Sequence, residues 1–349
     1  MRIVVVGASG NVGTSVLEAL AADTAVEEIV GVARRKPALT QAKTTWVEAD
    51  VVSSDLTNIF RGADCVIHLA WLIQPSRDLE TLQAVNVEGS ARVFHAVGTA
   101  GVPALVYASS VGAYSPGPKD PPVDESWPTE GVMSSYYARH KAATERLLDR
   151  FELEQPGVRV VRLRPGLIFK REAAAEIRRF FIGPLLPNPL VRRSLIPIVP
   201  RAKRLVFQAV HARDVGEAYR LAAVSDVRGA FNVAADPVLD GEVLAEALGA
   251  RPVSIHPGAL RALADASWRL RLQPAAPTWL DLAFGVPTMD TTRARTELGW
   301  TPRRRSDEAL LELLEGLRDG AAHDTPPLEA QAGGPLRVKE LLTGVGGRQ

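Results

Sequence analysis

Short apolar runs alternate with longer amphipathic segments through the first half of this 349-residue chain. The apolar runs are rich in β-branched residues, as expected of strands buried on both faces of a sheet. They occupy residues 3–7, 29–33, 66–70, 105–109 and 158–163, and helical patterns lie between them at 12–22, 81–100 and 133–152. Strands joined by helices predict an α/β fold with a doubly wound parallel sheet, because right-handed crossovers place helices on both faces.

The pattern changes after residue 166, and this change predicts the domain organisation. Residues 1–166 are expected to form the main sheet domain, to which residues 205–235 return through short apolar runs at 205–210 and 231–234. Residues 167–204 and 236–318 are expected to form a smaller C-terminal substrate-binding lobe. Residues 319–349 mix Gly, Pro, Thr and Gln, with one weak helical patch at 338–342, and are expected to be a mobile tail.

Composition argues against several classes of protein. A net charge of +1 and scattered arginines give little attraction for a nucleic-acid backbone. The six histidines are dispersed, none with another His or Cys at a metal-ligand spacing, so no metal site is expected. The single Cys65 cannot form an internal disulfide, and no apolar run approaches the length of a membrane span. A cytoplasmic enzyme acting on a small molecule is therefore expected, with neither a nucleic-acid nor a membrane partner.

The first predicted strand runs directly into the sequence Gly7-Ala8-Ser9-Gly10-Asn11-Val12-Gly13, and a helix follows. Glycines at this spacing permit a tight turn, close approach of a diphosphate and tight packing of the helix on the strand, while the helix N-terminus supplies free N–H groups. A glycine-rich turn without a ligand is the alternative. The strand-before, helix-after context favours a Rossmann-type dinucleotide site. Its expected contacts are Gly7, Ser9, Gly10, Asn11, Val12 and Gly13.

The second predicted strand ends in Gly31-Val32-Ala33-Arg34-Arg35. An acidic residue at this place bonds the ribose hydroxyls of NAD, whereas a guanidinium can grip the 2′-phosphate of NADP with two parallel hydrogen bonds. Arg34, and less directly Arg35, therefore favour NADP and leave NAD open. The alternative is that both arginines are solvated loop residues.

Tyr137 and Lys141 stand four residues apart in a predicted helix and so lie on one face. An ammonium about 4 Å from a phenol contributes on the order of 4 kcal/mol at an effective dielectric of about 20. That is enough to lower a tyrosine pKa near 10 by roughly three units. Tyr137 is therefore expected to be an acid/base near neutral pH, although a tyrosine and a lysine at this spacing also occur by chance.

Ser109 and Ser110 end the predicted strand at 105–109. Open α/β sheets bind their ligands at the carboxyl edge of the strands, so the Ser110 hydroxyl can bond a substrate oxygen. Paired serines also commonly end a strand and begin a turn, and this structural explanation stands beside the functional one.

Several ordered motifs together resemble the extended short-chain dehydrogenases, the NAD-dependent epimerase/dehydratase family. They are Gly7 to Gly13, His68-Leu69-Ala70, Ser109 to Tyr114, Tyr137 to Lys141 and Arg164-Pro165-Gly166. The resemblance implies that Ser110 orients the substrate oxygen, that Tyr137 carries the proton and that Lys141 holds the nicotinamide ribose. It further implies cofactor contacts or support from Asp50, Val51, Leu69, Ala70, Asn86 and Pro165. His211, Asp214 and residues 297–302 resemble later motifs of the family.

Two departures from the family pattern bear on the substrate. Trp71 follows His68-Leu69-Ala70 where a small residue is usual, which indicates either a bulky pocket wall or a core aromatic. The segment after Pro165 lacks the asparagine pair of many nucleotide-sugar epimerases, which weakens that substrate class. Six arginines between residues 178 and 204 suit either a phosphate-bearing substrate or a solvated surface, and Phe180-Phe181-Ile182 would equally line an apolar pocket.

Three functions remain open at this point. The first is hydride transfer at a hydroxyl or carbonyl carbon, with Tyr137 as the acid/base. The second is epimerisation or dehydration with a tightly held cofactor, and the third is a non-catalytic NADP-sensing protein. The resemblance also implies a homodimer, formed through the helices expected near 81–100 and 133–152.

Overall fold

The computed structural model describes residues 1–74, 77–183, 191 and 193–329. Its main sheet has seven parallel strands in the order β10-β6-β5-β4-β1-β2-β3. Their bounds are β1 Arg2–Val6, β2 Glu28–Ala33, β3 Thr44–Glu48, β4 Cys65–His68, β5 Ala104–Ala108, β6 Arg159–Pro165 and β10 Gly229–Val233. The chain reverses its direction of travel across the sheet after β3, as in a doubly wound fold. This confirms the predicted fold class.

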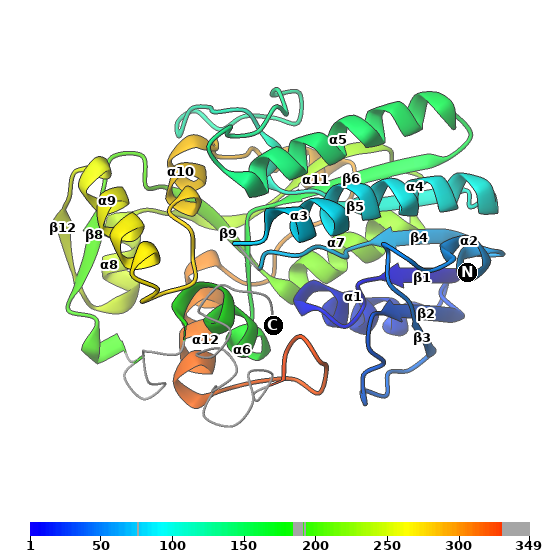
Figure 1. The fold of residues 1–349 in the computed structure, drawn as a ribbon, viewed down its shortest axis with the longest axis horizontal. Helices are drawn as coiled ribbons and strands as arrows, with labels where there is room; N and C mark the ends of the chain where they lie inside the picture. The colour runs from blue at the N-terminus through cyan, green and yellow to red at the C-terminus, as the bar shows by residue number, and fades with distance from the viewer. Residues whose placement is uncertain (75–76, 184–190, 192, 330–349) are drawn as a thin grey trace.

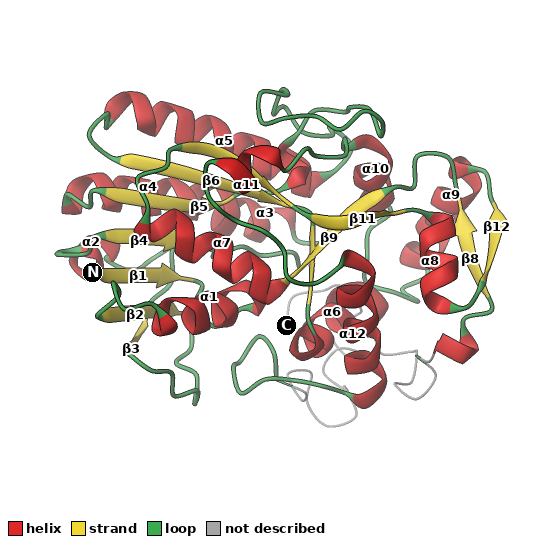
Figure 2. Ribbon diagram, turned by 180° about the vertical axis from the view of Figure 1, so that it is seen from behind, coloured by secondary structure: helices red, strands yellow, loops and turns green. Residues whose placement is uncertain are grey.

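Helices cover both faces of the sheet (Figures 1 and 2). One face carries α2 Leu56–Phe60, α3 Leu79–Gln83, α4 Gly89–Ala100 and α5 Tyr136–Glu154, and the other carries α1 Asn11–Ala22, α7 Ala212–Val224 and α11 Thr292–Thr296. Each face has its own core of apolar side chains, centred on Leu17, Ile67 and Tyr219 on the α1 and α7 side and on Phe60, Phe94 and Leu148 on the other. A π-helical turn, Ala84–Glu88, joins α3 to α4, so the helix expected at 81–100 is interrupted.

The remaining elements form the smaller lobe at one end of the sheet (Figure 1). A three-stranded sheet contains β11 Ala235–Leu239, β9 Phe207–His211 and β7 Leu167–Phe169, and β8 Ile198–Arg201 pairs with β12 Arg251–Ser254. The helices are α6 Ala174–Ile177, α8 Gly241–Leu248, α9 Pro257–Arg269, α10 Thr278–Gly285 and α12 Ser306–Asp319. Single turns of the lobe lie at Arg171–Ala173, Arg178–Ile182 and Arg193–Leu195, and the turn Val111–Ala113 follows β5 of the main sheet.

Two expected returns to the main sheet have different outcomes. The apolar run at 231–234 coincides with β10, which pairs with β6. The run at 205–210 forms β9, which pairs with β7 and β11 instead of entering the main sheet. Gly166, between β6 and β7, allows the backbone of β9 to pass close by, because a Cβ on residue 166 would stand 2.4 Å from the Gln208 carbonyl oxygen. The third strand, β3, was not predicted.

The C-terminal segment also differs from expectation where it is described. Thr325 and Leu328 are fully buried, and the amide of His323 donates to the Leu328 carbonyl. Residues 320–329 therefore begin the expected tail as a packed turn, while the helical patch at 338–342 lies outside the described residues.

In the described part of the chain, each helix is too short or too polar to cross a bilayer.

Candidate active site

The glycine turn between β1 and α1 uses its three glycines differently. Gly7 has φ +86°, and a Cβ on it would stand 2.7 Å from the Ala70 amide nitrogen. A Cβ on Gly13 would stand 2.4 Å from the Gly7 carbonyl oxygen. Gly10 differs, because its nearest atom would be 3.6 Å away. Two glycines are thus needed for the packing of the turn on its neighbours, and the third leaves an open backbone face.

The first turn of α1 also indicates an anion-binding site. Gly10 is its N-cap and supplies no capping side chain. Because an α-helix leaves its first N–H groups without intrahelical partners, those of Asn11, Val12 and Gly13 can bind an anion. The open face at Gly10 and these donors together fit the diphosphate of a dinucleotide.

Lys170 is a neighbour of this turn that was not predicted from the sequence. It follows β7 and is 3% exposed, and its Nζ donates to the Asn11 carbonyl at 2.7 Å and to the Thr14 hydroxyl at 2.6 Å. Burial lowers the pKa of Lys170 to about 8, although nearby glutamates such as Glu172 oppose the shift. A lysine after an isolated short strand carries no recognisable motif, so only the fold reveals this contact.

The other predicted cofactor residues follow the carboxyl ends of successive strands. Arg34 and Arg35 come directly after β2 and are exposed. Asp50 follows β3, where its carboxylate accepts the Val52 amide at 2.8 Å, and Val51 packs at the position where Gly89 lacks a side chain. Leu69 and Ala70 follow β4 beside Gly7, and Pro165 ends β6.

Asn86 holds the loop after β4 in place. It is 1% exposed and lies in the π-helical turn. Its Oδ1 accepts the Leu72 amide at 2.7 Å, and its Nδ2 donates to the Leu72 carbonyl at 2.8 Å. This pair of bonds fixes the residue next to Trp71, so Asn86 supports the site through the loop rather than by reaching into it.

Ser110, Tyr137 and Lys141 meet at the end of β5. The Ser110 hydroxyl accepts the Gly112 amide at 3.0 Å, and the same side chain opposes the effect of burial on the pKa of Tyr137. A Cβ on Gly112 would stand 2.8 Å from Cε1 of Tyr137, so the turn packs directly on the ring. Neighbouring Tyr136 instead donates its hydroxyl to the Ile73 carbonyl at 3.0 Å.

The expected lowering of the Tyr137 pKa is wrong. Burial raises the pKa of Tyr137 to about 12, and the Ser110 hydrogen bond opposes this only in part. The Lys141 Nζ lies 5.9 Å from the centre of the Tyr137 ring, donates to the Ala108 carbonyl at 2.6 Å and lies 3.5 Å from the centre of the Trp71 ring. Burial also holds the pKa of Lys141 well below its usual value, although the Glu145 charge opposes this.

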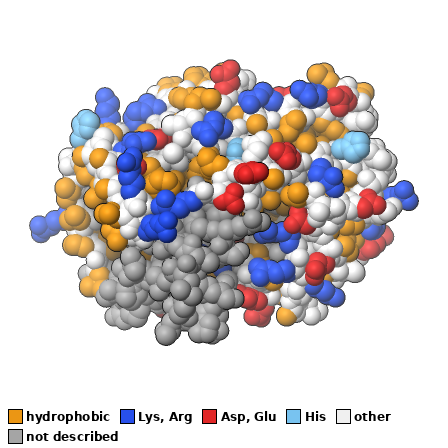
Figure 3. Space-filling model, in the orientation of Figure 1, with side chains coloured by type: hydrophobic (Ala, Val, Ile, Leu, Met, Phe, Trp, Pro, Cys, Tyr) orange, Lys and Arg blue, Asp and Glu red, His pale blue; other side chains and the backbone are white. Residues whose placement is uncertain are grey.

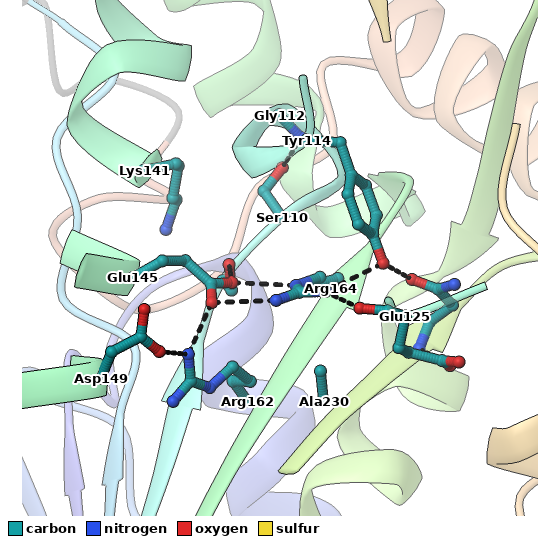
Figure 4. Close-up of polar contacts among 12 residues, drawn as sticks. Ser110, Gly112, Tyr114, Glu125, Lys141, Glu145, Asp149, Arg162, Arg164 and Ala230 are labelled. Atoms are coloured by element: carbon teal, nitrogen blue, oxygen red, sulfur yellow. Dashed lines mark hydrogen bonds and ion pairs between the residues drawn. The ribbon is translucent and has the colours of Figure 1, made fainter. Parts of the chain in front are cut away.

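A buried network of charged side chains lies next to Lys141 (Figure 4). Glu145, one helical turn after Lys141, is fully buried and bonds Arg162 at 2.9 Å and Arg164 at 2.9 and 3.0 Å. It also accepts the Ser109 hydroxyl at 2.5 Å. The carboxylate thus ties α5 to the ends of β5 and β6. This network was not predicted from the sequence.

The late family motifs assemble with each other at the junction of the two lobes. His211 caps α7 by accepting the Arg213 amide at 3.1 Å. The Trp300 indole donates to the Asp214 carbonyl at 2.7 Å, and the Asp214 carboxylate accepts the Arg304 amide at 3.1 Å. These contacts give the motifs a structural role in joining α7 to the C-terminal segment.

Comparison with known proteins identifies the family. The profile of the "NAD dependent epimerase/dehydratase family" matches residues 3–234, about two thirds of the chain. The chain belongs to this family. Membership makes it an NAD(P)-dependent enzyme of the short-chain dehydrogenase/reductase superfamily with an oxidoreductase chemistry, and epimerisation by the same chemistry is also compatible.

Individual relatives show the range within the family. An uncharacterized protein of Mycobacterium tuberculosis (strain ATCC 25618 / H37Rv) is 26% identical over 90% of this chain and 83% of its own length. The L-arabinose 1-dehydrogenase (NAD(P)(+)) of Haloferax volcanii is 30% identical over 50% of this chain and 70% of its own. The UDP-glucose 4-epimerase of Thermus thermophilus, solved with NAD, has a TM-score of 0.66 at 22% identity and covers 91% of this chain and 99% of its own. The structural likeness shows the fold.

Proposed function

We propose that this family member transfers hydride between NAD(P) and a carbon that bears a hydroxyl or carbonyl group, with Ser110, Tyr137 and Lys141 as its active site. The observation that carries the proposal is the packing of Gly112, beside Ser110, on the Tyr137 ring at the carboxyl edge of the sheet, with Lys141 on the same face of α5. Two relatives support it, since the Haloferax protein is named a dehydrogenase and a Shewanella oneidensis protein, 28% identical over 63% of this chain, is named a 2-alkyl-3-oxoalkanoate reductase.

Each residue has a defined part in this reaction. The dinucleotide, held at Gly7 to Gly13 by the amides of α1, accepts or supplies the hydride when bound. Ser110 donates a hydrogen bond to the substrate oxygen, and Tyr137 gives or takes the proton at its phenolic oxygen. The Lys141 ammonium bonds the nicotinamide ribose. The Tyr137 phenol is protonated at neutral pH, as the acid in carbonyl reduction must be, although burial raises its pKa to about 12 and makes it a weaker acid than a free tyrosine.

NADP is the proposed preferred cofactor. Arg34 and Arg35 are exposed beyond the end of β2, and neither side chain forms an ion pair or hydrogen bond with another of the described residues. Two guanidinium groups at this place suit a 2′-phosphate. NAD remains the alternative, because the structural relatives were solved with it.

Epimerisation or dehydration is the second candidate. It is supported by the UDP-glucose 4-epimerase of Mycolicibacterium smegmatis, which is 31% identical over 43% of this chain. The two reactions differ in whether the cofactor leaves after each turnover. Purified enzyme that releases its cofactor on dialysis and turns over added NADPH with a carbonyl substrate supports the oxidoreductase, whereas enzyme that retains oxidised cofactor and consumes none supports the epimerase.

Replacement of the two adjacent tyrosines tests the assignment. Tyr137→Phe removes the acid and is expected to lower kcat by about 100-fold or more while leaving the Kd for NADPH unchanged. Tyr136→Phe is the matched control, because this neighbour bonds the Ile73 carbonyl and is expected to keep most of its turnover. Normal turnover in Tyr137→Phe would refute the proposed role of the phenol.

A further inference from the structure

The wall beside Tyr137 is built from aromatic side chains. The Trp279 ring, on α10, lies 5.0 Å from the Tyr137 ring between centres, and the Trp71 ring lies 6.0 Å away on another side. Phe181 packs on Trp279 at 5.1 Å. The Nε1–H groups of Trp71 and Trp279 are both buried and have no acceptor among the described residues, so this wall offers two hydrogen-bond donors in an otherwise apolar surface.

Trp279 also forms part of a second feature, an apolar hollow between α9 and α10 of about 370 Å³. Its lining consists of Leu260, Leu263, Ala264, Ser267, Gln273, Ala275, Ala276, Trp279 and Leu280. Ala276 and Trp279 belong to the same apolar cluster as Tyr137. The hollow and the proposed site therefore share a wall.

The lining of this hollow carries no charged group that a sugar nucleotide could bind. None of its lining residues is ionised, and its two polar side chains, Ser267 and Gln273, bond each other at 3.2 Å. Arg261 and Asp281, on the two helices, form a two-pronged ion pair at 2.6 and 3.1 Å. A diphosphate buried here would lose its hydration and find only the Trp279 Nε1–H without a partner already, which is costly.

The helix α9, which supplies four of the nine lining residues, has a surface that a ligand could cover. No residue of α9 is buried, and Leu263 is 64% exposed. In Figure 3, hydrophobic side chains gather on this face over α9 and α10. An apolar ligand in the hollow would remove this surface from water, which is favourable in proportion to the area buried.

We propose that the substrate is an apolar ketone or the corresponding secondary alcohol, with its reacting carbon beside Tyr137 and a hydrocarbon body that lies against Trp279 and ends in the hollow between α9 and α10. The position of the reacting carbon rests on the proposed function, and the apolar body rests on the hollow. Reduction adds one hydride from the reduced dinucleotide to the carbonyl carbon and one proton from Tyr137 to its oxygen. The products are the secondary alcohol, the oxidised dinucleotide and the Tyr137 phenolate, which regains its proton from water.

Binding of a homologous series of ketones tests the substrate class without turnover. The probes are 2-butanone, 2-octanone and 2-dodecanone, titrated calorimetrically into enzyme saturated with NADP⁺, which cannot reduce them. The Kd is expected to fall about two- to fourfold for each added methylene until the hollow is filled, while UDP-glucose gives no heat of binding. A Kd independent of chain length, or tighter binding of UDP-glucose than of 2-dodecanone, would overturn the proposal.

Two exposed leucines provide matched variants. Leu263 lines the hollow, whereas Leu270, 70% exposed at the end of α9, lies outside its lining. Leu263→Gln is expected to raise the Kd for 2-dodecanone about tenfold and to leave 2-butanone unchanged. Leu270→Gln is expected to change neither. Equal effects of the two variants would show that the alkyl chain binds elsewhere and would overturn the proposal.

The two proposals fail in different ways. If the Kd depends on chain length and on Leu263 but Tyr137→Phe turns over normally, the apolar site stands and the proposed role of Tyr137 fails. If Tyr137→Phe abolishes reduction of 2-butanone but longer ketones bind no better, the proposed function stands and the apolar substrate class fails.

Discussion

Glu145 and Arg164 form a two-pronged buried ion pair, with Nε of Arg164 2.9 Å from Oε1 and Nη2 3.0 Å from Oε2. The side chains are 0% and 5% exposed. Bidentate geometry satisfies both carboxylate oxygens, and Arg162 adds a third bond. Glu145 follows Lys141 by one turn of α5. The ion pair of Glu145 with Arg164 therefore holds this part of α5, including Lys141, in position against β5 and β6 (Figure 4).

Removal of this carboxylate should be costly. Glu145→Gln keeps the shape of the side chain but leaves the buried Arg164 guanidinium without its counter-charge, while Arg162 keeps its ion pairs with Asp149 and Glu152. The free energy of unfolding is expected to fall by about 3 kcal/mol. Glu154→Gln is the control, because Glu154 lies exposed at the end of the same helix and should change stability by less than about 0.5 kcal/mol. Urea denaturation of both variants measures the difference, and equal stabilities would contradict the role of the pair.

Acid should weaken the same contact. Burial alone would raise the pKa of Glu145, but the hydrogen bonds and charges of Arg164 and Arg162 outweigh it and lower the pKa to about 2, from 4.5. A carboxylate whose pKa is lowered by folding stabilises the protein above its unfolded pKa, and the effect is lost as the pH falls toward the folded value. The stability of the wild type is therefore expected to fall between about pH 5 and pH 2, and that of Glu145→Gln to fall less. Parallel curves would contradict this assignment.

The sequence predicted the central strands because they are buried on both faces and read as continuous apolar runs. The edge strand β3 lacks that signal. Its sequence, Thr-Thr-Trp-Val-Glu, mixes polar and apolar residues, and its side chains are half-buried or exposed. Pairing with β2, and the packing of Trp46 where Gly31 has no side chain, secure it, and both are tertiary effects.

The proposed site was predicted only as far as local motifs reach. Ser110, Tyr137 and Lys141 carry a recognisable pattern, and the fold brings them together. The charge network had a weaker signal, since Arg162 and Arg164 alternate on a strand and Glu145, Asp149 and Glu152 share a helix face. The contact of Tyr137 with Trp279 had none, because residues on a separate lobe meet it only in the folded chain. Likewise, sequence spacing placed an ammonium near the phenol but could not show that burial would dominate the pKa.

Arg34 is expected to set the cofactor preference. Arg34→Ala removes the group proposed to bind the 2′-phosphate, so kcat/KM with NADPH should fall about tenfold or more while that with NADH is unchanged. Arg150→Ala, an exposed arginine on α5, is the control. Steady-state kinetics with both cofactors measure the ratio. A wild-type enzyme that prefers NADH would contradict the assignment.

Gly112 is expected to position the Tyr137 ring. A methyl group there would stand 2.8 Å from Cε1 of Tyr137, closer than van der Waals contact, so the ring must move in Gly112→Ala. Displacement of an acid by about 1 Å can cost up to about 100-fold in rate, and kcat should fall by about 10- to 100-fold with little change in Kd for the cofactor. Gly157→Ala, where a Cβ meets nothing within 4 Å, should behave as wild type. Equal kcat values for the two variants would contradict the prediction.

Replacement of Gly10 is expected to weaken cofactor binding without unfolding the glycine turn. Its Cβ would meet the Gly7 carbonyl oxygen only at 3.6 Å, and its φ of −79° suits any residue, so Gly10→Ala should cost less than about 1 kcal/mol of stability. The methyl group would nevertheless occupy the open face over which the diphosphate is proposed to lie, so the Kd for NADPH should rise at least about tenfold.

Gly13→Ala is expected to lower the stability of the protein, in contrast to Gly10→Ala, which is expected mainly to raise the Kd for NADPH. A methyl group there would collide with the Gly7 carbonyl oxygen at 2.4 Å, so this variant should lose about 2 kcal/mol or more of stability before any ligand is added. Thermal unfolding with and without NADPH measures both quantities for each variant. If Gly10→Ala kept both its stability and its affinity for NADPH, the diphosphate could not lie against the first turn of α1. A diphosphate bound there would clash with a methyl group on residue 10.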